Sequence, residues 1–251
     1  MSTELKHTGK VALVTGGGSG IGRASAERLA ADGALVIVAG RSEGQLKEVA
    51  ASHDRIDYIV ADVSDKTQVA ALVEGVVKKH GRLDILFNNA GVAKFLPLER
   101  VDGVHYDEQF NINVRGLIDV TLQALPHLKK NGGVILNNAS VVGDDPMPNG
   151  SIYSATKAAV IALGRSWAQE LAPARIRVNS VSPGPIETPI FARTGMSEKD
   201  LNDMAAGIQA SVPLGRFGQP EEIAGLVSFL ASDDAAFITG AQYKVDGGMS
   251  A

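Results

Sequence analysis

Short apolar runs rich in β-branched residues alternate along the chain with longer stretches in which apolar residues recur at helical spacing. A short apolar run bounded by turn residues is typical of a buried strand, whereas the longer stretches are typical of helices. This alternation predicts βαβ units, and therefore a parallel sheet covered by helices on both faces. No repeat or linker interrupts the pattern, so we expect one α/β domain over residues 1–251.

The pattern places the elements in order. We expect strands at residues 10–15, 34–39, 58–60, 83–87, 132–140 and 175–181, and a final strand and turn at 242–248. We expect helices at residues 23–32, 65–80, about 102–130, 152–171 and 220–230. Residues from about 187 to 216 have mixed polarity and no strand pattern. They predict a mobile segment that covers a substrate pocket.

A glycine-rich turn, residues 16–22, follows the first predicted strand and precedes the first predicted helix. Glycines at such a turn let the backbone approach a pyrophosphate, and the helix N-terminus favours negative charge. The spacing is G-x-x-x-G-x-G, formed by Gly16, Gly20 and Gly22. Alone it is compatible with an ordinary tight loop, but after the first strand it predicts nucleotide binding. A Walker-type phosphate loop is excluded, because no Gly-Lys-Ser/Thr follows.

The end of the second predicted strand bears on the choice of cofactor. An acid there binds the ribose 2′-hydroxyl of NAD, whereas an arginine accommodates the 2′-phosphate of NADP. Here the strand ends in Gly40-Arg41-Ser42, without an acid, which favours NADP(H) over NAD(H). The alternative is that Arg41 only closes the loop or stacks on adenine. Ser19 in the glycine turn is not basic, so that turn supplies no second charge for the phosphate.

Polar residues and turns follow several other predicted strands, at the edge where ligands gather in open α/β sheets. Asp62 follows the third strand, and it either hydrogen-bonds adenine, caps the next helix, or does both. Asn88 and Asn89 follow the fourth strand, and they either brace the neighbouring backbone or contact a cofactor. The proline-rich residues 182–189 follow the sixth strand as a rigid support for a bound ring.

Tyr153 and Lys157 are the main candidates for chemistry. They are four residues apart, so on the predicted helix they share one face. A free tyrosine titrates near ~10, and we expect the lysine ammonium to favour the phenolate and lower that pKa. Tyr153 is then a proton donor and acceptor near pH 7. Ser140 ends an apolar run upstream, where its hydroxyl can hold a substrate oxygen. A lone Tyr-x-x-x-Lys is common on helix surfaces, so the rest of the chain must support this interpretation.

Asn113 lies inside the long predicted helix, where asparagine competes for backbone hydrogen bonds. It predicts a local distortion that holds a water, unless it is simply a solvent-facing residue.

Composition narrows the possible partners. The net charge of −4 argues against nucleic acid or an anionic membrane as the main partner. The absence of cysteine excludes disulfides, thiolate catalysis and cysteine-ligated metals. The five histidines are scattered, so we expect no metal site. No apolar run approaches the ~18 residues of a membrane helix, and we expect a cytoplasmic protein.

Taken together in this order, the motifs resemble the short-chain dehydrogenase/reductase family over essentially the whole chain. They are Thr15-Gly16-x-x-x-Gly20-x-Gly22, Asn88-Asn89-Ala90-Gly91, Asn113, Ser140, Tyr153-x-x-x-Lys157 and Pro183-Gly184. The resemblance implies a single Rossmann-type doubly wound domain, with a mostly parallel seven-stranded sheet flanked by helices. It also implies a bound nicotinamide dinucleotide and a homotetramer built through two long helices and the C-terminal region.

The resemblance also implies residue roles. Tyr153 would be the general acid/base, and Lys157 would lower its pKa and hold the nicotinamide ribose. Ser140 would orient the reacting carbonyl or hydroxyl, and Asn113 would support a proton-relay water. The residues expected at the cofactor are Gly16, Ser19, Gly20, Ile21, Gly22, Arg41, Ser42, Asp62, Val63, Asn89, Ala90, Gly91, Tyr153, Lys157, Pro183, Gly184, Ile186 and Thr188.

Two positions depart from the family's pattern. Ala139 stands where the family often has a second serine, and Asn138 stands where an apolar residue or serine is common. Neither change removes a catalytic group, but both alter the floor of the pocket.

The residues expected around the substrate indicate its chemical class. The expected pocket walls contain Val142, Met147, Phe191, Met196 and Met204, which indicates a small apolar ketone or secondary alcohol. Asp144 and Asp145 would disfavour an anionic substrate if they faced inward. In the reduction direction, a hydride would pass from the nicotinamide to the carbonyl carbon while Tyr153 protonates the oxygen.

Three other functions are compatible with parts of the sequence. A 3-oxoacyl-carrier-protein reductase would need a basic docking patch beside the pocket. The candidate residues are dispersed in the sequence, at Arg100, Arg115, Lys129 and Lys130. An NAD-dependent sugar or polyol dehydrogenase is disfavoured by Arg41. A non-catalytic dinucleotide sensor is disfavoured because it would not need Asn113, Ser140, Tyr153 and Lys157 together.

Overall fold

The apolar runs form a seven-stranded sheet in a computed structural model, which describes residues 5–188 and 198–251, with side chains from residue 205 in the second range. All strand pairs are parallel, in the order β3-β2-β1-β4-β5-β6-β7. The strands are β1 (Val11–Thr15), β2 (Leu35–Gly40), β3 (Ile56–Val60), β4 (Ile85–Asn88), β5 (Gly133–Asn138), β6 (Ile176–Pro183) and β7 (Gln242–Val245). The prediction of a seven-stranded parallel α/β fold is confirmed, with strand ends displaced by a few residues.

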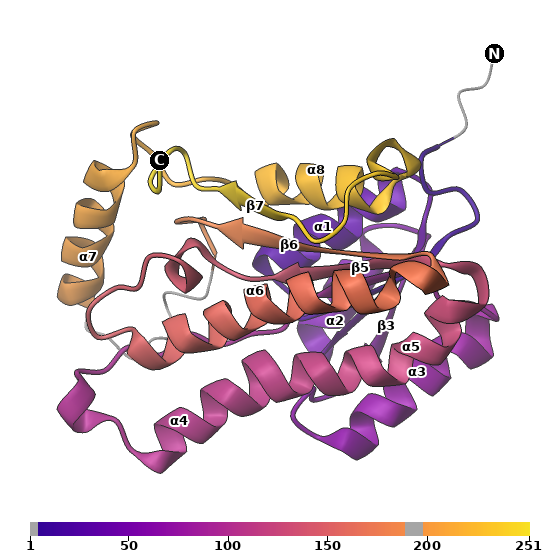
Figure 1. The fold of residues 1–251 in the computed structure, drawn as a ribbon, viewed down its shortest axis with the longest axis horizontal. Coiled ribbons are helices and arrows are strands. Elements are labelled where there is room, and N and C mark those ends of the chain that lie inside the picture. Colours follow the sequence, from indigo (N-terminus) through magenta and orange to yellow (C-terminus); the bar gives the residue numbers. More distant parts are fainter. Residues whose placement is uncertain (1–4, 189–197) are drawn as a thin grey trace.

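Helices cover both faces of this sheet (Figure 1). Helices α1 (Gly20–Ala31), α2 (Glu43–Ala51) and α8 (Pro220–Ala231) pack on one face. Helices α3 (Lys66–His80), α5 (Leu117–Asn131) and α6 (Ser151–Leu171) pack on the other. Helices α4 (Gly103–Phe110) and α7 (Glu198–Ser211) complete the described set. Within the described residues, no helix is both long and apolar enough to cross a membrane.

Burial on both faces explains why the strands are continuous apolar runs. Successive side chains of β1 alternate between the two cores: Ala12 and Val14 join the core under α1 and α8, while Val11 and Leu13 join the core under α3 and α5. All four are at most 2% exposed. A polar residue at any of them would be buried on one face or the other.

The strand order places a crevice between β1 and β4. The chain builds β2 and β3 on one side of β1 and then returns to β4 on its other side. Such a reversal in an open parallel sheet opens a ligand crevice at the carboxyl ends of the strands. The turns after β1 and β4, residues 16–19 and 89–97, therefore flank the expected cofactor site.

The long helix predicted at about 102–130 is divided. A π-helical turn, Asn111–Gly116, separates α4 from α5. The distortion predicted at Asn113 is confirmed, and it has two local causes. The Asn113 side chain binds the backbone of Val92, and a Cβ on Gly116 would lie 2.8 Å from the carbonyl oxygen of Val63. The wider turn fits the chain between these two loops.

Two further details differ from the predictions. Helix α2 was not predicted, because Leu46 and Val49 are the only buried side chains among its nine residues. Asp65 caps α3, since its carboxylate accepts from the backbone N–H groups of Thr67 and Gln68. Asp62 was a candidate for this cap, and it does not form it.

Candidate active site

A cavity of 890 Å³ lies at the carboxyl edge of the sheet, where the expected cofactor and catalytic residues meet. All of the expected site residues line it except Gly22 and Asn113, which lie behind its wall. The lining members are Gly16, Ser19, Gly20, Ile21, Arg41, Ser42, Asp62, Val63, Asn89, Ala90, Gly91, Ser140, Tyr153, Lys157, Pro183, Gly184, Ile186 and Thr188.

The glycine turn forms one end of the cavity. Gly16 adopts φ +63°, and a Cβ there would meet the Ala90 Cα at 2.8 Å. Gly22 faces inward, and its Cβ would collide with the Gly16 carbonyl oxygen and lie 2.5 Å from Asn89 Nδ2. Gly22 is therefore a packing residue beneath the turn and does not line the cavity, and its expected cofactor contact stays a prediction.

The turn is tied to the adjacent strand β4. Asn89 Nδ2 donates to the carbonyl oxygens of Thr15 at 2.9 Å and Gly16 at 3.1 Å. Thr15 Oγ1 accepts from the backbone N–H groups of Asn89 and Ala90, both at 3.0 Å. Asn89 thus braces the backbone and lines the cavity, so both of its predicted roles are compatible with the structure.

This end of the cavity fits a pyrophosphate. The glycines of the turn carry no side chains that would keep a ligand away from the backbone. Helix α1 begins at Gly20 with its first N–H groups unpaired within the helix. The Ser19 side chain does not cap these groups, so they remain for a ligand. A helix N-terminus that follows a glycine-rich turn binds the phosphate groups of dinucleotides.

The far wall at β2 and β3 carries opposite charges. Arg41 Nη1 lies 4.0 Å from Asp62 Oδ2, and the arginine side chain is 62% exposed. Asp62 Oδ1 also accepts from the backbone N–H and the hydroxyl of Ser64, at 2.9 and 2.7 Å. Arg41 is therefore held loosely and can turn toward a ligand phosphate, while Asp62 is fixed at the cavity edge.

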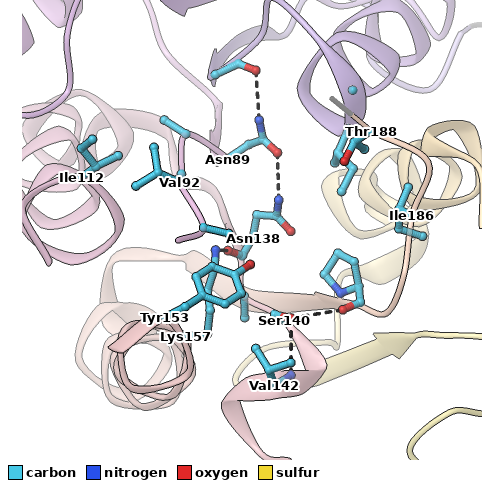
Figure 2. A pocket seen from close by; sticks show the side chains of 18 of the residues that line it. Asn89, Val92, Ile112, Asn138, Ser140, Val142, Tyr153, Lys157, Ile186 and Thr188 are labelled. Atoms are coloured by element: carbon cyan, nitrogen blue, oxygen red, sulfur yellow. Dashed lines mark hydrogen bonds between the residues drawn. The ribbon is translucent and has the colours of Figure 1, made fainter. Parts of the chain in front are cut away.

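Tyr153 and Lys157 lie on the first two turns of α6, and Ser140 lies two residues after the end of β5 (Figure 2). Lys157 Nζ donates to the carbonyl oxygen of Asn138 at 2.7 Å and lies 5.7 Å from the centre of the Tyr153 ring. The structure brings these three side chains together at one site, as the sequence predicted.

Burial controls the protonation of this pair. It raises the pKa of Tyr153 to about 12, and the Ser140 side chain opposes part of that rise. Burial also lowers the pKa of Lys157 to about 8. The expectation that Lys157 lowers the tyrosine pKa is therefore wrong for this structure, because burial raises that pKa and the Lys157 ammonium is directed at the Asn138 carbonyl oxygen. At neutral pH Tyr153 carries its proton and is ready to donate it.

The Ser140 hydroxyl is only weakly committed to the protein. It donates to the carbonyl oxygen of Pro183 and accepts from the backbone N–H of Val142, both at 3.4 Å. Hydrogen bonds of this length are weak. The hydroxyl can therefore exchange them for a substrate oxygen.

Asn113 positions the site without lining it. Its Oδ1 accepts from Val92 N at 2.8 Å, and its Nδ2 donates to Val92 O at 2.9 Å and to Thr156 Oγ1 at 3.1 Å. The side chain thus clamps the loop after β4 onto α6. These three bonds commit the side-chain amide to the protein, and the expected role of Asn113 at a proton-relay water stays a prediction.

The substrate end of the cavity is largely apolar. Val142 and Met147 line it as expected. Asp145 also lines it, whereas Asp144 faces β7, where it accepts from Gln242 and lies 3.9 Å from Lys244 Nζ. Of the other expected wall residues, Phe191 and Met196 lie outside the described residues, as does the side chain of Met204.

Some wall residues were not predicted. Phe95, in the loop after β4, packs edge-to-face on Tyr153 with ring centres 5.9 Å apart. Met249 lines the cavity from the turn after β7. Because β7 is parallel to the other strands, its carboxyl end reaches the same edge of the sheet. The rule that parallel strands end at one edge could therefore have predicted Met249 at the cavity. No group of metal-ligating side chains occurs among the described residues.

Comparisons with known proteins agree with this geometry. Residues 16–250 match the protein family described as enoyl-(acyl carrier protein) reductase. The chain is 44% identical over 249 residues to an uncharacterized oxidoreductase of Methylorubrum extorquens, covering 97% of this chain and 99% of that one. It is 41% identical over 250 residues to a 3-oxoacyl-[acyl-carrier-protein] reductase of Thermotoga maritima, covering 98% of this chain and 99% of that one. The crystal structure of a 3-ketoacyl-(acyl-carrier-protein) reductase from Brucella melitensis complexed with NADH is also similar. It superimposes with a TM-score of 0.91 at 39% identity, covering 97% of this chain and 99% of that one.

Proposed function

The chain belongs to the short-chain dehydrogenase/reductase family of oxidoreductases, and from this premise we propose that it uses NADP(H) to reduce a small apolar ketone or oxidise the matching secondary alcohol. The observation that carries the proposal is one cavity that holds a phosphate-binding turn at one end and Ser140, Tyr153 and Lys157 at the other.

Each residue of the reacting end has a role in this reaction. A bound nicotinamide dinucleotide supplies the hydride that the carbonyl carbon receives. Tyr153 gives its phenolic proton to the carbonyl oxygen, so that its O–H bond breaks as the alcohol O–H bond forms. Ser140 donates a hydrogen bond to the same oxygen. Lys157 is positively charged below its pKa of about 8 and would hold the nicotinamide-side ribose. In the oxidation direction Tyr153 takes the proton back.

The reaction is tested by following nicotinamide oxidation with purified protein and a panel of carbonyl compounds. The apolar walls, which include Phe95, Val142, Met147 and Met249, favour apolar cyclic or aromatic ketones over sugars. Turnover of such ketones at pH 7 supports the proposal. Activity confined to sugars or polyols with NAD would replace it with a polyol dehydrogenase.

The cofactor preference rests on Arg41. We expect NADPH to bind at least tenfold tighter than NADH, a difference of about 1.4 kcal/mol. Arg41→Ala removes the charge that contacts the 2′-phosphate, so it should weaken NADPH binding about tenfold and leave NADH binding within twofold. Fluorescence titration at fixed salt measures both. Arg55→Ala is the matched control, because Arg55 is exposed and does not line the cavity. Equal or tighter binding of NADH by the unmodified protein would contradict this preference.

A second candidate is the reduction of 3-oxoacyl thioesters on an acyl carrier protein. It is favoured by the names of the Thermotoga maritima and Brucella melitensis relatives. The four candidate residues for a basic docking patch, Arg100, Arg115, Lys129 and Lys130, do not line the cavity itself. Lys94 does line the cavity, but Glu108 pairs with it. Comparing a 3-oxoacyl thioester with a simple ketone under one cofactor separates the two candidates.

Exposed apolar side chains support a homotetramer. Leu98, Val104 and Leu122 lie along the α4–α5 side and are 57–75% exposed, and Phe237 near β7 is fully exposed. A subunit interface over these side chains would remove their apolar surface from water. We expect light scattering to give four times the 26.2 kDa chain mass, and Leu122→Glu to lower that mass. A monomer at micromolar concentration would contradict the assembly.

A further inference from the structure

Strand β4 ends at Asn88, which Asn89 follows, and strand β5 ends with Asn137 and Asn138 beside them. Asn88 and Asn137 are register partners, and Asn89 and Asn138 follow them. Because neighbouring side chains point to opposite faces, the four amides form two rungs. On the face under α5, Asn88 Nδ2 donates to Asn137 Oδ1 at 3.0 Å. On the cavity face, Asn138 Nδ2 donates to Asn89 Oδ1 at 2.9 Å.

The orientation of the cavity-side rung is fixed by the glycine turn. Asn89 uses its Nδ2 to donate to the Thr15 and Gly16 carbonyl oxygens, which accept and cannot donate. Its Oδ1 must therefore face Asn138, and Asn138 must present its Nδ2. The remaining oxygen, Asn138 Oδ1, is directed away from this chain of hydrogen bonds.

Asn138 Oδ1 is a buried acceptor with no hydrogen-bond partner among the described residues. Asn138 lines the cavity, and Figure 2 shows its oxygen pointing toward the side formed by Ile186 and Thr188. A buried acceptor without a donor destabilises a protein unless a ligand or water supplies one.

The position of this oxygen along the cavity identifies the donor. Asn138 is joined on one side to Asn89, which holds the pyrophosphate-binding turn, and on the other to Lys157, whose Nζ donates to its carbonyl oxygen at 2.7 Å. In a dinucleotide the unit between the pyrophosphate and the nicotinamide is a ribose. The ionised pyrophosphate has no donor, whereas the ribose has two hydroxyls.

We propose that Asn138 Oδ1 accepts a hydrogen bond from a hydroxyl of the nicotinamide-side ribose, which makes Asn138 a cofactor-binding residue of this chain. The inference rests on the proposed function, because it requires a bound dinucleotide. The same side chain then connects the glycine turn, the ribose and the lysine of the reacting end.

The test compares ligands that contain successively more of the dinucleotide. ADP lacks the second ribose, ADP-ribose contains it, and NADH and NADPH add the nicotinamide. Isothermal titration calorimetry on Asn138→Leu and Asn138→Ala measures each affinity without turnover. We expect ADP to bind within twofold of the unmodified protein. We expect ADP-ribose and both dinucleotides to bind about tenfold more weakly, or about 1.4 kcal/mol. Leucine has a similar volume and keeps water out, while alanine removes the side chain if leucine prevents folding.

Asn137→Ala is the matched control, since it removes the same amide one residue earlier on the opposite face. It should leave the ratio of ADP to ADP-ribose affinity unchanged. Equal weakening of ADP and ADP-ribose by the Asn138 variants would mean that Asn138 only braces the turn, and would overturn the assignment. Loss of dinucleotide affinity with normal ADP-ribose affinity would move the contact to the nicotinamide and also overturn it. Failure of the unmodified protein to bind either dinucleotide would overturn the proposed function together with this assignment.

Discussion

Replacing Tyr153 with phenylalanine is expected to lower kcat by about 10²–10⁴-fold while leaving the fold unchanged. The variant loses only the hydroxyl that protonates the substrate oxygen. The ring stays, so the edge-to-face contact with Phe95 is kept. Since burial holds the tyrosine pKa at about 12, the hydroxyl carries its proton throughout the assay range, and its loss removes the general acid. Initial rates of ketone reduction at saturating cofactor measure the effect.

Tyr106→Phe makes the same chemical change away from the cavity. Tyr106 is 43% exposed and stacks on Phe110, and it does not line the site. We expect its kcat to stay within twofold of the unmodified protein. A thermal melt of both variants shows that they are folded. If Tyr153→Phe kept near-normal turnover, another group would have to be the proton donor and the mechanism above would be wrong.

Replacing Gly22 with alanine is the second change with a large expected effect. Its Cβ would collide with the Gly16 carbonyl oxygen and lie 2.5 Å from Asn89 Nδ2, so the turn and its brace must separate. Overpacking of this kind costs about 1–3 kcal/mol of stability, which for a chain of this size lowers Tm by about 2–12 °C. We also expect dinucleotide affinity to fall more than tenfold, because the displaced backbone binds the pyrophosphate.

Gly225→Ala provides the comparison within a helix that has room. Gly225 lies in α8, and nothing lies within 4 Å of its Cβ position. Alanine is favoured over glycine inside a helix by roughly 0.5–1 kcal/mol, so Tm should stay level or rise. Differential scanning calorimetry and dinucleotide titration are the measurements. Normal affinity in Gly22→Ala would show that the glycine turn does not hold the cofactor.

The sequence was informative wherever one residue type has one local consequence. Apolar runs such as residues 11–14 located the strands, since both faces of the sheet are buried. The spacing of Tyr153 and Lys157 placed them on one helical face, and Asn113 marked the π-helical turn. Parallel strands end at one edge of the sheet, so residues as distant as Gly16 and Thr188 could be expected at one cavity, and both line it.

The sequence was less informative where the surroundings of a residue decide its pKa or the direction of its side chain. Burial of Tyr153 and the direction of Lys157 toward Asn138 set the pKa values, and neither can be read from residue types. The opposite directions of Asp144 and Asp145 depend on where β7 lies. Met249 reaches the cavity only because the last strand joins the sheet in parallel.

The brace on the glycine turn has a consequence for biosynthesis. The turn is translated early, but Asn89, which fixes it, emerges from the ribosome 73 residues after Gly16, and Asn138 follows 49 residues later still. Strand β1 likewise must wait for β4 to gain its second neighbour. Parallel pairing of this range is slow to form. A nascent chain that ends before β5 therefore has no finished cofactor site, and the dinucleotide can stabilise only a chain whose folding is already well advanced.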